Sequence, residues 1–267
     1  MKEFFGFGGY TREPEGYMSW QHLLFVGILL TIMTALAIVL GMKNRKYDET
    51  KKNKVLIVAA ILIDSIELFK IILFCFRSGN PMSWLYDLPL FLCSIQLITI
   101  PLAAFSKGRV REAALDFVFI FGLLGAILGT IAAGNNYAAY PVLSADNVIS
   151  GITHCISGFS SLYIAISGLS SMKKKNALIS FAILIGFSIP AYIVNRLVGS
   201  NYMFLMQGDG TPYDILYNLL DGNKILYPIS VVALLLIYIS AFYLIYFLVN
   251  SKKADNADDL SVAGHVY

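Results

Sequence analysis

Apolar stretches of about 20 residues recur along almost the whole chain, each long enough to cross the ~30 Å hydrocarbon core of a bilayer as an α-helix. Within lipid, only helices and closed barrels satisfy their own backbone hydrogen-bonding groups. Hydrophobic residues make up 57% of the chain and charged residues 14%, and the mean hydropathy of +0.69 exceeds what a soluble domain needs. The sequence therefore predicts an all-α, polytopic membrane protein.

The pattern of apolar stretches predicts seven transmembrane helices and no separate soluble domain. The predicted spans are Trp20–Met42, Val55–Phe76, Leu88–Phe105, Ala113–Ala133, Val148–Ser170, Ala177–Gly199 and Ile225–Val249. Residues 1–19 precede the transmembrane domain of residues 20–249, and residues 250–267 form a charged tail. A longer loop, from Ser200 to Lys224, follows the sixth span, and its stretch Tyr213–Leu220 is predicted to form a short helix on the membrane surface.

The basic residues predict the orientation of the chain. Of the 20 lysines and arginines, 14 follow the first, third, fifth and seventh spans. They are Lys43, Arg45, Lys46, Lys51, Lys52, Lys54, Lys107, Arg109, Arg111, Lys173, Lys174, Lys175, Lys252 and Lys253. Because cytoplasmic loops carry the excess of positive charge, we expect the N-terminus outside the cell membrane and the C-terminus in the cytoplasm. A count of six spans would break this alternation.

Several classes of function are disfavoured by the same residues. The net charge of +3 comes from short loops beside the spans, where lysine and arginine set topology and contact anionic lipids rather than nucleic acid. No phosphate-binding loop, dinucleotide fingerprint or zinc-ligand spacing occurs. We therefore expect no metal, no cofactor and no nucleic-acid partner, and chemistry within or at the edge of the bilayer.

The second predicted span carries three ionisable residues, Asp64, Glu67 and Lys70. Ionisable side chains are costly inside a membrane and mark candidate functional sites. Their spacing places Glu67 next to both of the others on adjacent turns of one helix. Two interpretations stay open: a self-neutralising Glu67–Lys70 ion pair that faces the bundle interior, or a lined polar cavity.

Polar and reactive residues of other spans are predicted to reach a similar depth in the outer half of the bilayer. Cys93 and Gln96 lie one to two turns below the outer end of the third span, and His154 lies at a similar depth in the fifth. Residues at the outer ends are His22, Asn195, Arg196, Asn201 and Tyr202. Asp116 lies near the inner end of the fourth span, where it is expected to snorkel to the interface. Gly151 and Gly158 predict close helix packing.

A cysteine and a histidine at matched depth suit acyl-transfer chemistry. The thiolate is the nucleophilic form of cysteine, and a nearby imidazole can take the thiol proton and later protonate a leaving oxygen. Glu67 is a candidate to orient His154, while Arg196 or Lys70 could hold a phosphate headgroup. Alternatively, Cys93 is a small buried apolar residue and His154 makes a helix–helix hydrogen bond.

The segment Leu88-Pro89-Leu90-Phe91-Leu92-Cys93-Ser94 resembles the Leu-Pro-Leu-x-Leu-Cys segment of the YwaF-like family of bacterial integral membrane proteins. His154 follows at the spacing that the family shows, and Asn201-Tyr202-Met203-Phe204-Leu205 is similar to its Asn-Tyr-Met-x-Leu segment. A related eukaryotic branch is regarded as a transmembrane ether-phospholipid acyltransferase with a membrane cysteine. The resemblance implies that Cys93 is the nucleophile and His154 its partner. It departs at Phe91, where many members carry histidine.

The first candidate function is a lipid acyltransferase that acts on membrane phospholipids or lysophospholipids. The residues expected around its substrate are Gln96, Asn195, Asn201 and Tyr202. Two further functions compete with it. One is a proton-coupled transporter or small-molecule-binding protein that uses Asp64, Glu67 and Lys70, although the chain shows no internal repeat. The other is a seven-helix receptor or photoreceptor. The seventh predicted span holds no lysine for a retinal Schiff base, which disfavours a microbial rhodopsin.

Overall fold

The computed structural model describes residues 1–170 and 172–263, with side chains to Asn250, and every regular element in these ranges is helical. The longer helices are α2 (Trp20–Asn44), α3 (Glu49–Ser78), α4 (Gln96–Phe105), α5 (Gly108–Thr130), α7 (Ala145–Ser167), α8 (Ala177–Val198) and α10 (Leu226–Ala263). The shorter ones are α1 (Lys2–Phe5), α6 (Gly134–Ala139), α9 (Tyr213–Leu219) and the 3₁₀ turns η1 (Pro81–Tyr86), η2 (Lys174–Asn176) and η3 (Tyr202–Phe204).

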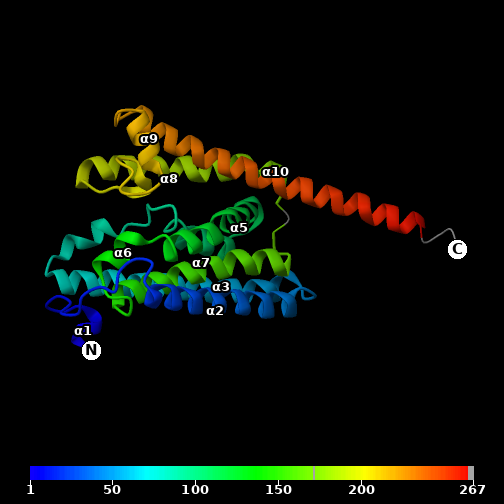
Figure 1. Cartoon of the computed structure of the whole chain (residues 1–267). Coiled ribbons are helices and arrows are strands. Elements are labelled where there is room, and N and C mark those ends of the chain that lie inside the picture. Colours follow the sequence, from blue (N-terminus) through cyan, green and yellow to red (C-terminus); the bar gives the residue numbers. More distant parts are fainter. Residues whose placement is uncertain (171, 264–267) are drawn as a thin grey trace.

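The helices form two packed groups that run roughly parallel to one another (Figure 1). In the larger group, α7 packs against α2, α3 and α5, and α4 fills the space between α3 and α5. The smaller group consists of α8, α9 and α10 and joins the bundle through α5. The N-terminus and the end of α10 lie at opposite ends of the molecule.

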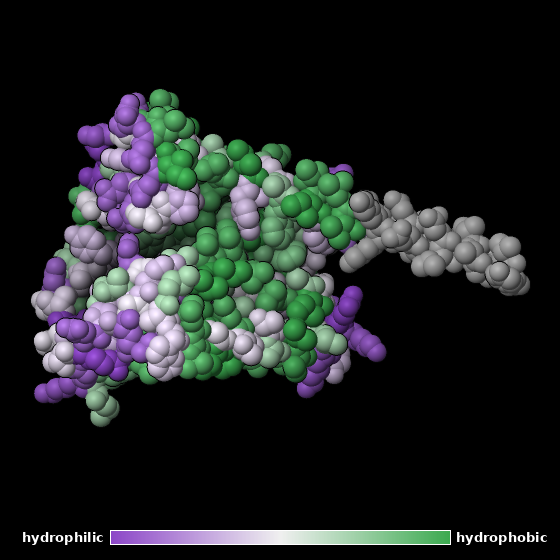
Figure 2. All heavy atoms as spheres, in the orientation of Figure 1, coloured by the Kyte–Doolittle hydropathy of each residue, from purple (hydrophilic) through white to green (hydrophobic). Residues whose placement is uncertain are grey.

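Five helical segments are long and apolar enough to cross a membrane, among the residues that the structure describes. They are Trp20–Asn44, Gly108–Ala139, Ala145–Ser167, Lys174–Val198 and Leu226–Asn250. Figure 2 shows the consequence on one face: apolar residues occupy the middle of the molecule, with hydrophilic residues gathered at one end and a few at the other. The multi-pass membrane architecture is therefore confirmed, whereas seven spans and the orientation stay predictions.

The second and third predicted spans differ from simple crossing helices, for different reasons. The second lies inside α3, a continuous helix of 30 residues, but Asp64, Glu67 and Lys70 make it more polar than the other spans. The third is not one helix: residues 87–95 form turns, and α4 begins only at Gln96. The predicted helix Leu88–Phe105 is therefore wrong over its first half.

Small residues allow α5 and α7 to pack closely. A Cβ on Gly122 of α5 would lie 2.7 Å from the Ser157 carbonyl oxygen of α7, and a Cβ on Gly158 of α7 would lie 2.5 Å from the Ala126 Cβ. Gly151 meets α2 instead, where a Cβ would lie 2.8 Å from a Leu29 methyl. The close packing predicted at Gly151 and Gly158 is thus confirmed.

Asp116 links the two groups of helices and does not snorkel as predicted. Its side chain is buried and accepts hydrogen bonds from Ser170, from Asn176 Nδ2 at 2.8 Å and from the Tyr243 hydroxyl at 3.2 Å. Tyr243 belongs to α10, so the carboxylate connects α5 to the smaller group. Packing of α8 and α10 over α5 encloses Asp116, and the three donors replace the water that it loses.

An ion-pair network closes the end of the bundle at which the chain starts. Arg77 of α3 forms a two-pronged pair with Asp146 of α7, with Nη–Oδ distances of 2.6 and 2.7 Å. The hydroxyl of Tyr10 donates to the same carboxylate. The hydrogen bonds to Asp146 raise the pKa of Arg77, and burial with the Asp146 contact raises the pKa of Tyr10 to about 12. This network fixes the first residues over the ends of α3 and α7.

Candidate functional site

Lys70 is the centre of a buried charged cluster on α3. Its ammonium lies 2.5 Å from Glu67 Oε1 and 3.2 Å from Asp87 Oδ1. Glu67 is one helical turn away, whereas Asp87 follows η1, the turn that folds back over the end of α3. Two carboxylates therefore neutralise one lysine in a site that is largely removed from solvent. The structure confirms the predicted Glu67–Lys70 pair and adds Asp87 to it.

Cys93 lies in the turns between η1 and α4. The Gln96 N–H donates to the Cys93 carbonyl at 3.3 Å, so the cysteine immediately precedes the first turn of α4. Donors at the start of a helix can stabilise a thiolate or a developing oxyanion. The break in the third predicted span thus places Cys93 beside the start of α4, where a continuous helix would have placed it in a helix interior.

His154 of α7 lies against the same face of α5 as Cys93. A Cβ on Gly129 would come within 2.2 Å of the His154 ring, and a Cβ on Gly125 would lie 3.6 Å from the Cys93 Cβ. Gly125 and Gly129 are neighbours on one helix face, one turn apart. The imidazole and the cysteine therefore contact neighbouring positions on one face of α5, and both residues are half-buried.

Glu67 makes its ion pair with Lys70, and no hydrogen bond joins it to His154 within the described part of the chain. The structure therefore assigns the Glu67 carboxylate to Lys70, in place of the predicted direct contact with the imidazole.

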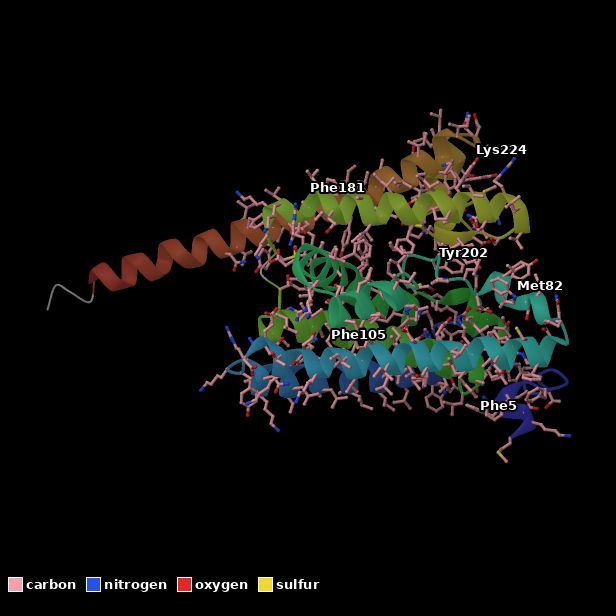
Figure 3. The ribbon with its side chains drawn as sticks, turned by 180° about the vertical axis from the view of Figure 1, so that it is seen from behind. Phe5, Met82, Phe105, Phe181, Tyr202 and Lys224 are labelled. Carbon is pink, nitrogen blue, oxygen red and sulfur yellow. The ribbon has the colours of Figure 1, made fainter. Side chains whose placement is uncertain are left out.

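The loop after α8 holds the Cys93 segment in place. The Tyr202 hydroxyl donates to the Leu85 carbonyl at 2.6 Å and accepts from the Leu88 N–H at 3.1 Å. Its ring packs edge-on against Phe91, with centroids 4.8 Å apart. Figure 3 shows Tyr202 in the space between α8 and the helices of the larger group. Tyr202 thus covers the segment before Cys93 on the side that faces the smaller group, and Phe91 is its packing partner.

Asn195 and Asn201 shape this loop. The Asn195 side chain accepts from the Tyr202 N–H at 2.6 Å and donates to the Tyr202 carbonyl at 3.0 Å. The Asn201 side chain donates to the Gln207 carbonyl at 3.0 Å and accepts from the Met206 N–H at 3.0 Å. Both side chains bond to backbone partners and so position Tyr202 and its loop, while their contact with substrate stays a prediction.

Three other predicted residues differ in their surroundings. Arg196 is exposed at the end of α8 and pairs with no residue in the described ranges. Asp64 is exposed on the surface of α3 and takes no part in the Lys70 ion pairs. Gln96 is fully buried beside Cys93 in sequence; its Oε1 accepts from Thr99, and its Nε2 has no partner among the described residues. Of the three, Gln96 offers an unused donor in the interior.

His22, the predicted polar residue at the start of the first span, is part of the packing. Its ring is buried, with Nδ1 accepting from the Met18 N–H at 3.1 Å and Nε2 lying 3.2 Å from the Thr130 carbonyl. It also stacks on Tyr137 with ring centroids 3.9 Å apart. His22 therefore fastens the start of α2 to the end of α5.

An open cavity of about 560 Å³, lined by both polar and apolar residues, lies next to the charged cluster. Its lining includes Asp87, Arg77 and the aromatic rings of Tyr10, Tyr86 and Tyr140. Asp87 faces this cavity and also pairs with Lys70, so it connects the cavity to the buried cluster. A polar group can thus approach the Lys70 cluster from the end of the bundle at which the chain starts.

Sequence reasoning missed Asp87, Gly125 and Gly129. The spacing Gly125-x-x-x-Gly129 is a known signal for close helix contacts and could have been read. No sequence pattern marks Asp87, because its ion pair with Lys70 depends on the path of η1.

The helices, their apolar surface and the buried charged cluster define a multi-pass helical membrane protein with an interior polar site. The comparisons agree and are more specific: the sequence model of the TMEM164 family matches residues 17–250. The chain belongs to this family of multi-pass membrane proteins. No curated protein and no solved structure matches it significantly. The match gives the family name TMEM164 and not the predicted YwaF name.

Proposed function

We propose that this protein is a lipid acyltransferase of the cell membrane that forms an acyl-thioester on Cys93. The observation that carries the proposal is the placement of Cys93 and His154 on one face of α5, over Gly125 and Gly129. A nucleophile and a base against the same face of one helix, in a membrane interior, fit acyl transfer between lipids. The resemblance of the Leu88–Ser94 segment to the YwaF-like family and its ether-phospholipid acyltransferase branch supports the same assignment.

In the first half-reaction, His154 takes the proton of the Cys93 thiol, and the thiolate attacks the ester carbonyl of a phospholipid. The carbon–sulfur bond forms and the ester carbon–oxygen bond breaks. The departing glycerol oxygen takes the proton back from His154, which releases a lysophospholipid. Backbone N–H groups at the start of α4, next to Cys93, would stabilise the negative charge that develops on the carbonyl oxygen.

In the second half-reaction, the hydroxyl of an acceptor lysophospholipid gives its proton to His154 and attacks the thioester carbon. The new ester bond forms, the carbon–sulfur bond breaks, and His154 returns the proton to the thiolate. The two steps exchange an acyl group between two lipids without water, an oxidant or a metal.

The polar part of the substrate would occupy the cavity beside Asp87. Arg77 and three tyrosines line this cavity. Because both Arg77 terminal nitrogens pair with Asp146, the tyrosine rings remain to receive an amine headgroup. In the predicted orientation the cavity opens toward the outer leaflet, so the proposed substrates are phospholipids or lysophospholipids of that leaflet.

The test is the intact mass of the purified protein after incubation with mixed phospholipid vesicles. We expect a fatty-acyl adduct that hydroxylamine removes, that persists in the Cys75→Ser and Cys155→Ser variants, and that is absent from Cys93→Ser. Cys75 and Cys155 are matched controls because all three cysteines are free. The His154→Ala variant should acylate far more slowly. An adduct that survives Cys93→Ser, or no adduct on any variant, would refute the proposal.

A further inference from the structure

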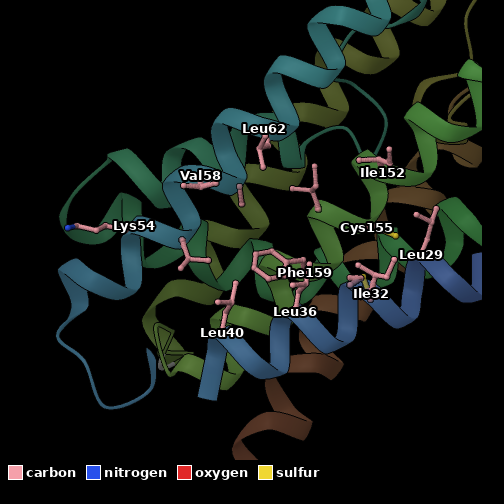
Figure 4. A pocket seen from close by; sticks show the side chains of 14 residues that line it. Leu29, Ile32, Leu36, Leu40, Lys54, Val58, Leu62, Ile152, Cys155 and Phe159 are labelled. Atoms are coloured by element: carbon pink, nitrogen blue, oxygen red, sulfur yellow. The ribbon is translucent and has the colours of Figure 1, made fainter. Parts of the chain in front are cut away.

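An apolar groove runs along the outside of the larger group of helices, on a different face from the Cys93 site. Its volume is about 550 Å³, and α2, α3 and α7 all contribute to its lining. Figure 4 shows the groove with Leu36 and Leu40 of α2 on one side, Val58 and Leu62 of α3 on the other, and Phe159 of α7 between them. The lining side chains are apolar apart from a single charged residue, Lys54.

The length of the groove matches one leaflet of a bilayer. On α2 its lining extends from Leu29 to Leu40. At 1.5 Å per residue this span measures roughly 16 Å, about half of the ~30 Å hydrocarbon core. Because α2 is a membrane-spanning candidate, the groove lies at bilayer depth, where a lipid acyl chain is the molecule available to fill it.

Lys54 closes one end of the groove with a positive charge. Figure 4 shows its side chain pointing away from the apolar lining. Lys54 is exposed and makes no ion pair with any residue that the structure describes, in contrast to Lys70 and Lys173. The nearby lysines Lys51 and Lys52 add to the positive potential at this end. An unpaired cation at the headgroup level complements an anionic headgroup.

We infer that the groove between α2, α3 and α7 binds an anionic phospholipid, with one acyl chain along the helices and the headgroup phosphate at Lys54. In the predicted orientation this lipid belongs to the cytoplasmic leaflet. It is a bound lipid and not a substrate, because Cys93 and His154 are absent from the groove lining. The inference therefore does not depend on the proposed acyl transfer.

Delipidated protein in mild detergent can be titrated with phosphatidylglycerol or with phosphatidylcholine and analysed by native mass spectrometry. We expect one phosphatidylglycerol to bind more tightly than phosphatidylcholine. Lys54→Gln should weaken that site about fivefold, as the loss of one lysine near a lipid surface implies. Lys46→Gln is the matched control, since Lys46 is an exposed lysine of the preceding loop and does not line the groove.

A second pair of variants tests the acyl-chain contact without disturbing the core. Val58 and Ile61 are both exposed on α3, at 56% and 55%, but only Val58 lines the groove. Val58→Trp should fill the groove and abolish the tight site, whereas Ile61→Trp should retain it. Equal binding by the two tryptophan variants, or phosphatidylglycerol bound no better than phosphatidylcholine, would overturn the inference.

Discussion

Gly129 of α5 lies directly against the imidazole of His154, with the ring 2.2 Å from where a Cβ would stand. A glycine is required there because any side chain would occupy the space of the ring. One turn earlier, a Cβ added to Gly125 would lie 3.6 Å from the Cys93 Cβ, which is an ordinary van der Waals distance. The two glycines thus differ in what they can tolerate, and this difference provides a test of the site.

Gly129→Ala should displace the His154 ring and slow the acylation of Cys93 about a hundredfold, as a shift of about 1 Å in a catalytic group can do. The added methyl should also cost about 1–3 kcal/mol of stability through overpacking. Gly125→Ala should acylate at close to the wild-type rate. The measurement is the rate of adduct formation by intact mass, with thermal unfolding recorded in parallel. Equal rates for the two variants would show that the His154 position does not matter.

Lys70→Met should destabilise the protein by roughly 3 kcal/mol, because Glu67 and Asp87 would keep their charges in a buried site without a partner. Lys70→Arg, which keeps the charge, should cost less, and adding Glu67→Gln to Lys70→Met should recover part of the loss. Chemical unfolding in detergent measures these free energies. Lys224→Met is the control, since the Lys224 side chain is exposed. No recovery in the double variant would contradict a charge-based explanation.

Tyr202→Phe should loosen the segment that carries Cys93. It removes the hydrogen bonds to Leu85 and Leu88 but keeps the ring against Phe91, at a cost of about 1–3 kcal/mol. In a protein with Cys75 and Cys155 replaced by serine, we expect faster alkylation of Cys93 by a maleimide. Tyr192→Phe, which loses an exposed hydrogen bond to the Lys224 carbonyl, should leave the alkylation rate unchanged. If Tyr202→Phe also left the alkylation rate of Cys93 unchanged, the Tyr202 hydrogen bonds would not be what holds the Cys93 segment in place.

The N-terminal residues should detach in acid. Burial raises the pKa of Glu15, but the Val142 N–H at 2.8 Å and the Arg12 guanidinium outweigh it and hold the pKa below its ordinary value of 4.5. A lowered pKa means that the contact stabilises the folded chain above pH 4.5 and that this contribution is lost as the pH falls through the folded pKa.

Limited proteolysis of residues 1–19 between pH 3 and 7 would reveal this loss as faster cleavage at the acid end. Glu15→Gln should be cleaved readily at every pH, whereas Glu13→Gln should behave like wild type, because Glu13 is exposed. A pH profile that Glu15→Gln does not alter would assign the acid response to other groups.

Hydropathy and charge placement were sufficient to predict the helical membrane architecture, because the bilayer demands apolar helices of a fixed length. The same patterns predicted the Glu67–Lys70 pair, which is local to one helix, and the close contacts of Gly151 and Gly158. The short helix predicted at Tyr213–Leu220 is also present, as α9. In each case the interaction follows from residues near in sequence or from the period of a helix.

The tertiary structure decided what lies between distant segments. Asp87 reaches Lys70 because η1 folds back over α3, and Asp116 is buried because α8 and α10 pack over α5. The Leu88–Cys93 segment is apolar enough to suggest a helix. Its Leu88 N–H instead donates a hydrogen bond to the Tyr202 hydroxyl, which stabilises the turns. Hydrophobicity is a property of each segment and is readable from the sequence, whereas hydrogen bonds between segments depend on where the chain brings them together.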